Sequence, residues 1–219
     1  MSLQAVIDRA SSIEISRRKL GGQTISRSGR VKTSSVASVV PFQFKVQMAH
    51  GLRYSTNREL VEEIDRLGRI FTETIDIGNS NPGLAYITEY LGQLSTVQLD
   101  QIVVSSADAL AIELNVGPVT GTNPATILFR KGDFIQLDTG YKYPYTVTSD
   151  VLRGTESTVT VPINRPFIEQ PDYTVSGKGI LVGTDVTFHV VMTMKPDFRI
   201  VPHDLLEFTS GFELIEVIE

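Results

Sequence analysis

Residues 127–162, ILFRKGDFIQLDTGYKYPYTVTSDVLRGTESTVTVP, decide the fold class of this chain. They contain short runs in which apolar and polar side chains alternate, separated by Gly132-Asp133, Thr139-Gly140 and Arg153-Gly154. Alternation with a period of two indicates half-buried strands, and tight turns between antiparallel strands favour Gly and Asp. The stretch therefore predicts a small antiparallel β-barrel of the OB-like or SH3-like type.

Alternation continues outward on both sides of this stretch. Residues 42–48 (FQFKVQM) alternate without a fault, and 96–104, 180–194 and 211–218 also read as strands. The exception is 57–70, where apolar residues recur at helical spacing. We therefore expect a mostly β chain with one clear α-helix.

The order of these segments predicts an insertion. Residues 1–40, rich in Ser, Thr and basic side chains, read as an extended basic N-terminal arm. Residues 41–95 and 196–219 would pair into one α+β domain that includes the helix 57–70. Residues 96–195 would form a second domain, the inserted OB-like barrel, because chain segments that meet in space tolerate such insertions.

Composition argues against several classes of site. The 219 residues include no cysteine, which excludes disulfides, Cys–zinc sites and thiol catalysis. The three histidines share no ligand spacing, and the Gly-rich segments lack the Lys-Ser/Thr of a phosphate loop. We expect no catalytic residue, no metal site, no cofactor and no enzymatic activity. No run of eighteen apolar residues and no signal peptide is visible, so no membrane insertion is expected.

Charge is unevenly distributed along the chain. Residues 1–53 hold nine basic and two acidic side chains, a net charge of +7, while the remainder carries −12. A basic segment can contact nucleic acid or an acidic protein surface. We favour protein, because the segment lacks the interleaved aromatic residues of a single-strand binder. The candidate intersubunit contacts are Arg17, Arg18, Lys19, Arg27, Arg30 and Lys32.

Taken in order, these segments resemble the distal tail proteins of long-tailed bacteriophages, in the subtype whose collar domain carries an inserted OB-like barrel. The resemblance is carried by the strand 42–46 (FQFKV), the helix 57–70, the strand 72–77, the barrel passage 131–162 and the return strand 186–190 (VTFHV). It covers about residues 40–218, as a spacing of elements more than as invariant motifs. The long basic N-terminal segment departs from the shorter relatives.

The resemblance implies a structural virion protein that forms a ring, hexameric in this family, at the distal end of the tail. Its partners would be copies of itself, the tail tube protein and the baseplate or hub proteins. DNA would pass through the lumen without specific binding, and like-charge repulsion from the acidic remainder of the chain agrees with that. The expected location is the tail tip of the virion, with host cytoplasm during assembly.

A second hypothesis reads the barrel as a carbohydrate-binding or host-surface-binding module. It depends on four tyrosines taken as exposed on the barrel: Tyr141, Tyr143, Tyr145 and Tyr173. Aromatic rings can stack on sugars, but the alternation around Tyr143 and Tyr145 also suits packing in a core. The sequence leaves both hypotheses open.

Overall fold

The computed structural model describes residues 3–17, 40–66, 71–138, 140–168 and 174–218, together with the backbone of 21–25 and 31–35. The chain is mostly β, with several antiparallel sheets and one long helix in these ranges. The α-helices are α1 (Leu3–Asp8), α2 (Tyr54–Arg66) and α3 (Thr96–Leu99), and the 3₁₀ turns are η1 (Ala85–Ile87) and η2 (Gly183–Asp185). The strands are β1 (Ala10–Arg17), β2 (Gly21–Ile25), β3 (Val31–Ser35), β4 (Phe42–Met48), β5 (Leu52–Arg53), β6 (Thr72–Asp76), β7 (Val103–Asp108), β8 (Ala111–Asn115), β9 (Ile127–Phe129), β10 (Phe134–Leu137), β11 (Tyr145–Thr146), β12 (Val151–Leu152), β13 (Thr158–Pro162), β14 (Ile180–Val182), β15 (Thr187–Met194), β16 (Phe198–Val201), β17 (Leu205–Phe208) and β18 (Phe212–Glu216).

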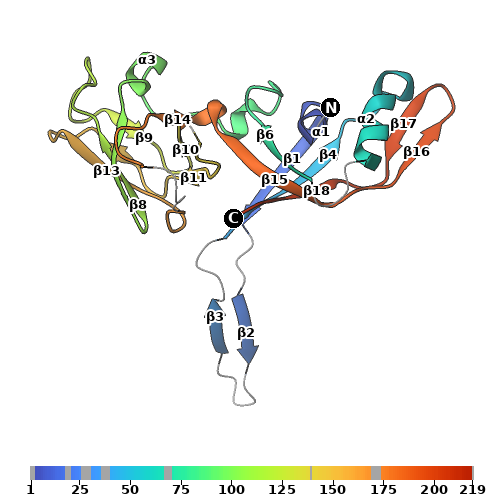
Figure 1. The fold of residues 1–219 in the computed structure, drawn as a ribbon, viewed down its shortest axis with the longest axis horizontal. Coiled ribbons are helices and arrows are strands. Elements are labelled where there is room, and N and C mark those ends of the chain that lie inside the picture. Colours follow the sequence, from blue (N-terminus) through green and yellow to red (C-terminus); the bar gives the residue numbers. More distant parts are fainter. Residues whose placement is uncertain are drawn as a thin grey trace.

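A five-stranded antiparallel sheet in the order β1-β4-β18-β15-β6 forms the middle of the molecule (Figure 1). It combines strands from the first 80 and the last 35 residues of the chain, so its core depends on long-range pairing. In β4, Phe42, Phe44 and Val46 are buried while the residues between them are not, as the alternation predicts. We call this sheet, with α1, the sheet lobe.

The start of the chain differs from the expected arm over 1–40. The side chains of Leu3, Val6 and Ile7 in α1 are buried in the core of the sheet lobe. β1 is an outer strand of the same sheet, with Arg17 opposite Phe42. Residues 3–17 are therefore part of the folded lobe, because their apolar side chains have a core to enter. β2 and β3 pair with each other as a separate two-stranded sheet, drawn below the sheet lobe in Figure 1.

A second lobe is inserted between β6 and β15 and contains β7 to β14 with α3. Its strands form three small sheets, in the orders β11-β10-β14, β12-β9 and β13-β8-β7, and strand pairing among the described residues does not join these sheets into one closed ring. Twenty-one buried apolar residues, among them Ile112, Leu114 and Ile135, form its core. We call this unit the inserted lobe.

The end of the insertion differs from the expected boundary at residue 195. β15 lies in the five-stranded sheet, where Phe188 pairs opposite Ile75 of β6 and Val191 opposite Ile215 of β18. Its inward side chains, Phe188 and Val190, are fully buried in the sheet lobe. Composition cannot separate β15 from β14, because both are apolar strands joined only by the short η2 turn.

Helix α2 and the three-stranded sheet β16-β17-β5 make up the far end of the molecule, which we call the wing (Figure 1). The expected helix over 57–70 begins earlier, at Tyr54, and 67–70 lie outside the described residues. The N-terminus of α2 is capped by Asp204, which lies in the turn between β16 and β17. Asp204 accepts hydrogen bonds from the Ser55 backbone N–H at 2.8 Å and from the Ser55 hydroxyl at 2.5 Å. Both His203 and Asp204 have positive φ, so the tight β16–β17 turn aims this carboxylate at the helix.

The two chain segments that connect the lobes lie in close contact with each other. A Cβ added at Gly78 would lie 2.7 Å from the Thr184 Cα, and one added at Gly183 would lie 2.9 Å from the Tyr90 Cβ and backbone N. Gly183 also has φ +69°, a conformation that L side chains rarely adopt. The two connections therefore touch at positions where only glycine fits.

Candidate assembly surfaces

Of the six basic residues predicted to contact a neighbouring subunit, Arg17 is the one whose side chain the structure describes. Its guanidinium carbon lies 5.6 Å from the centre of the Phe42 ring, and burial together with the nearby Arg165 lowers the pKa of Arg17. Lys32 lies on β3 opposite Thr24, with its backbone alone described. Arg18, Lys19, Arg27 and Arg30 lie outside the described residues. The described part of the chain therefore does not define a common surface formed by the six residues.

The two outer strands of the five-stranded sheet differ in accessibility. At the β6 edge, the Gln4 side chain of α1 donates to the Asp76 carbonyl at 2.7 Å and accepts from the Asp76 N–H at 2.6 Å. The Leu3 N–H donates to the Glu73 carboxylate at 2.5 Å. α1 thus satisfies part of the β6 edge as a neighbouring strand would. Within the described residues, no strand pairs with the outer side of β1. An open edge presents unpaired N–H and C=O groups to another chain.

A groove of about 430 Å³ lies between the start of β1, the end of β4 and β17. Its walls combine hydroxyl, amide and apolar groups: Ser11, Ser12, Gln47, Met48, Ala49, His50, Leu206, Glu207, Phe208 and Ser210. Glu207 is already paired with Arg199 at 2.6 Å. The groove can therefore accept hydrogen-bonding and apolar groups, and it lies next to the open strand β1.

The tyrosines taken as exposed on the barrel are buried where the structure describes them. Tyr141, Tyr143 and Tyr145 are 5%, 1% and 0% exposed. The Tyr145 hydroxyl accepts a hydrogen bond from the Ile168 N–H at 2.9 Å, and its ring stacks on Phe167. Burial raises the pKa of Tyr145. This corrects the expectation of a tyrosine surface, because these rings fill the core of the inserted lobe. Tyr173 lies outside the described residues.

Buried polar side chains to which the sequence analysis assigned no role include Asp133, Arg165 and Glu216. Asp133 accepts hydrogen bonds from the Arg130 and Leu91 N–H groups, at 2.8 and 3.0 Å. Arg165 and Glu216 form an ion pair with 1% and 0% of their side chains exposed. One signal for Glu216 is present in the sequence, because it follows Phe212 and Leu214 at a spacing of two and so falls on the buried phase of β18. Arg165 carries no comparable signal, since it lies in a loop.

Across the described ranges, no three His, Cys, Asp or Glu side chains are placed to hold a metal ion. None of the described helices combines the length and the apolar character needed to cross a bilayer. No protein-family model matches this chain, and no curated protein matches it in sequence.

Proposed function

We propose that this protein is a structural subunit of a phage tail tip, where copies of the chain assemble into a ring between the tail tube and the hub or baseplate. The observation that carries the proposal is the order of the elements. A sheet built from both ends of the chain holds an inserted β lobe, which is the arrangement expected from the resemblance to distal tail proteins. Such a subunit acts through its interfaces, so its functional surfaces are strand edges and charged segments.

Two further features support self-association. The outer side of β1 has no described partner strand, so it is available to a neighbouring chain. Each copy also carries a basic segment, with a net charge of +7 on residues 1–53, and an acidic remainder with a net charge of −12. The basic segment of one copy is therefore attracted to the acidic part of another. Opposite charges favour contacts between unlike parts of two identical subunits, and contacts of that kind form a ring when the rotation from one subunit to the next closes on itself.

The test of the ring is direct. Negative-stain images of the purified chain should show discrete rings, six-fold if the family symmetry holds, and light scattering should give a mass several times that of the 24.1 kDa chain. Because exposed charges are screened at high ionic strength, raising the salt concentration should shift the population toward smaller species. A monodisperse species of one chain mass at high concentration and low salt would contradict the proposal.

The contribution of the basic segment can be tested separately. Arg17 lies opposite Phe42 in the β1–β4 pair, so a short Gly-containing turn can replace residues 18–39 without removing α1 or β1. We expect this variant to fold and to assemble less well. Residues 18–39 hold five basic side chains, so the matched control neutralises five exposed basic residues elsewhere and should assemble normally: Arg58, Arg66, Lys131, Lys195 and Arg199, each to Gln. Normal assembly of the shortened variant would refute the role of the segment and leave the ring itself to the imaging test.

The carbohydrate-binding alternative is not proposed. It depended on exposed rings at Tyr141, Tyr143, Tyr145 and Tyr173, and the first three, which the structure describes, are buried.

A further inference from the structure

A bidentate ion pair between Arg165 and Glu216 joins the two lobes. Arg165 follows β13 in the inserted lobe, and Glu216 ends β18 in the sheet lobe. The guanidinium donates from Nη1 to Glu216 Oε2 at 2.5 Å and from Nη2 to Glu216 Oε1 at 2.7 Å. Two parallel hydrogen bonds between planar groups restrict rotation as well as distance. The pair therefore constrains the angle at which the lobes meet.

Both lobes supply the remaining partners of these two side chains. Arg165 donates to the Pro144 carbonyl of its own lobe at 2.7 Å and to the Val40 carbonyl beside β4 at 3.2 Å. Glu216 accepts from the Phe42 N–H at 3.0 Å. The guanidinium carbon also lies 4.9 Å from the Phe42 ring centre and 5.3 Å from that of Tyr145, one ring from each lobe. Rotation of one lobe against the other would break contacts on both sides.

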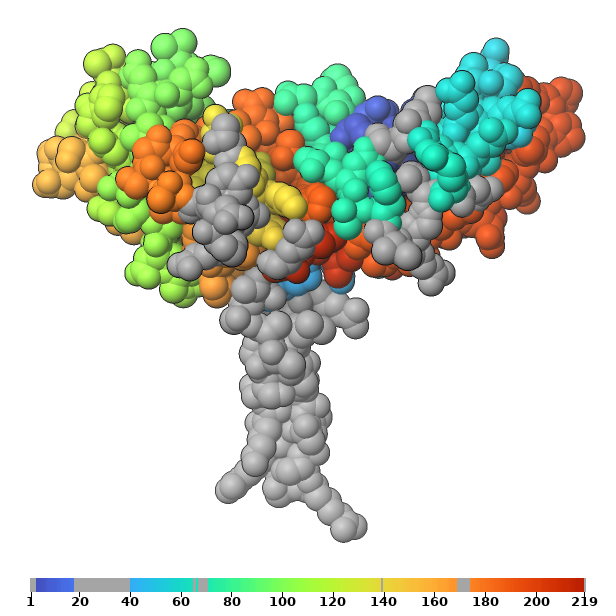
Figure 2. Space-filling view, in the orientation of Figure 1, coloured from blue at the N-terminus to red at the C-terminus, as the bar shows by residue number. Residues whose placement is uncertain are grey.

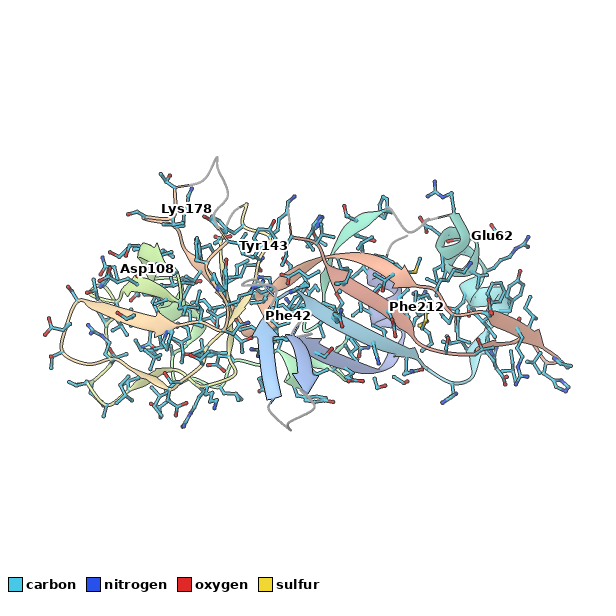
Figure 3. The ribbon with its side chains drawn as sticks, turned by 90° about the horizontal axis from the view of Figure 1, so that it is seen from below. Phe42, Glu62, Asp108, Tyr143, Lys178 and Phe212 are labelled. Atoms are coloured by element: carbon cyan, nitrogen blue, oxygen red, sulfur yellow. The ribbon has the colours of Figure 1, made fainter. Side chains whose placement is uncertain are left out.

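Apolar contacts across the same junction are less directional. Phe134 of the inserted lobe packs in the sheet-lobe core, with its ring centre 5.7 Å from that of Phe188. In the opposite sense, Ile218 packs against the core of the inserted lobe. Figure 3 shows the labelled Phe42 and Tyr143 near the middle of the long axis, between Asp108 and Glu62 toward its two ends. Figure 2 shows the described parts of the lobes meeting along this middle region.

We propose that the Arg165–Glu216 pair is an orientation lock, which holds the inserted lobe at one angle to the sheet lobe in the free subunit. A buried ion pair contributes little net stability over apolar residues of similar size, because removing both charges from water offsets their attraction. Apolar contacts tolerate sliding and rotation, whereas the two-point pair accepts one arrangement. The lock acts within a single chain, so it stands independently of the ring proposal.

The experiment compares orientation with stability. The chain has no cysteine, so spin labels can be placed at Lys45→Cys on β4 of the sheet lobe and Thr155→Cys in the inserted lobe, two exposed positions on opposite sides of the junction. With the labelled chain diluted into an excess of unlabelled chain, so that labels on neighbouring subunits do not contribute, pulsed electron spin resonance reports the distribution of distances between the two lobes of one chain. The unsubstituted pair should give one narrow distribution. Arg165→Met and Glu216→Gln should each lower the melting temperature, because each leaves a buried polar partner unsatisfied.

The decisive variant is the double substitution Arg165→Met with Glu216→Met. It should recover part of the melting temperature lost by the single variants, because no unpaired charge stays buried, while its distance distribution broadens. A matched control, Arg199→Met with Glu207→Met, removes an Arg–Glu pair that is 71% and 42% exposed and should change neither measurement. A folded double variant that keeps the narrow distribution would overturn the proposal. A broad distribution in the protein with the intact pair would overturn it without any variant.

Discussion

Replacing three glycines by alanine separates backbone strain from crowding. Gly78 and Gly183 lie in the connections between the lobes, and Gly154 lies between β12 and β13 of the inserted lobe. Gly154 has φ +61° with nothing within 4 Å of an added Cβ, so Gly154→Ala introduces backbone strain alone. Gly78 has no positive φ, but its Cβ would lie 2.6 Å from the Thr88 hydroxyl and 2.7 Å from the Thr184 Cα, so Gly78→Ala introduces crowding alone. Gly183 combines φ +69° with atoms of Tyr90 at 2.9 Å, two of its nearest neighbours being backbone atoms.

The expected losses of unfolding free energy follow from these geometries. An L residue in the left-handed region costs about 1–2 kcal/mol, and alanine returns about 0.4–1 kcal/mol by restricting the unfolded chain. Gly154→Ala should therefore cost about 1 kcal/mol. Crowding in a packed site costs about 1–3 kcal/mol, the range for Gly78→Ala, and Gly183→Ala should cost about 2–4 kcal/mol because both terms apply.

Urea denaturation followed by far-ultraviolet circular dichroism measures all three variants on the same scale. The chain has no tryptophan, so the backbone signal is the appropriate probe. The slope with urea concentration should stay constant, since a single methyl group changes little of the surface that unfolding exposes. Equal losses at Gly183 and Gly154 would refute the reasoning, because the only large difference between these sites is the contact with Tyr90.

Three further predictions concern individual polar contacts. Ser55→Ala removes a hydroxyl that donates to Asp204, so the lowered pKa of Asp204 should rise toward its usual value, as a carboxylate titration by nuclear magnetic resonance would show. A carboxylate with a lowered pKa stabilises the fold at pH values above its pKa in the unfolded chain, and this stabilisation is lost on acidification. The variant should therefore lose less stability than the parent chain when the pH is lowered. Burial raises the pKa of Tyr90 to about 12. The stabilisation linked to this shift should be complete below the pKa of about 10 that tyrosine has in the unfolded chain, and it should be lost as the pH rises toward 12. Tyr90→Phe should therefore flatten this part of the curve of unfolding free energy against pH. Tyr145→Phe leaves the buried Ile168 N–H without its acceptor and should cost about 1–3 kcal/mol in urea denaturation; a neutral result would contradict the bond.

Local patterns predicted the class of most elements. The alternation in 42–48 and the apolar spacing around Leu60 and Ile64 arise from strand and helix geometry, which is set within a few residues. The same local reasoning failed for residues 3–17. They fall within the Ser-rich, basic segment 1–40, yet four residues of α1 are buried, because partners some 70 residues away in β6 complete their environment.

The tyrosines show a second limit of the sequence. A Tyr side chain suits a core and a surface about equally, since it is a large apolar ring with one polar atom. Tyr145 is buried because the Ile168 N–H meets its hydroxyl, and that partner lies 23 residues away. The sequence does not reveal the assembly surfaces for the same reason. Which edge of the sheet stays accessible depends on Gln4, whose side chain hydrogen-bonds to the Asp76 backbone at the β6 edge.

The sequence by itself determined a β-rich chain with one main helix, because strand alternation and helical spacing are properties of neighbouring residues. It also determined the separation of charge, which is a matter of counting along the chain. Only the tertiary structure decided that β15 belongs to the sheet lobe, that no described strand pairs with the outer side of β1, and that Arg165 meets Glu216 between the lobes. These outcomes depend on contacts between residues distant in sequence, and such contacts exist only once the whole chain has packed.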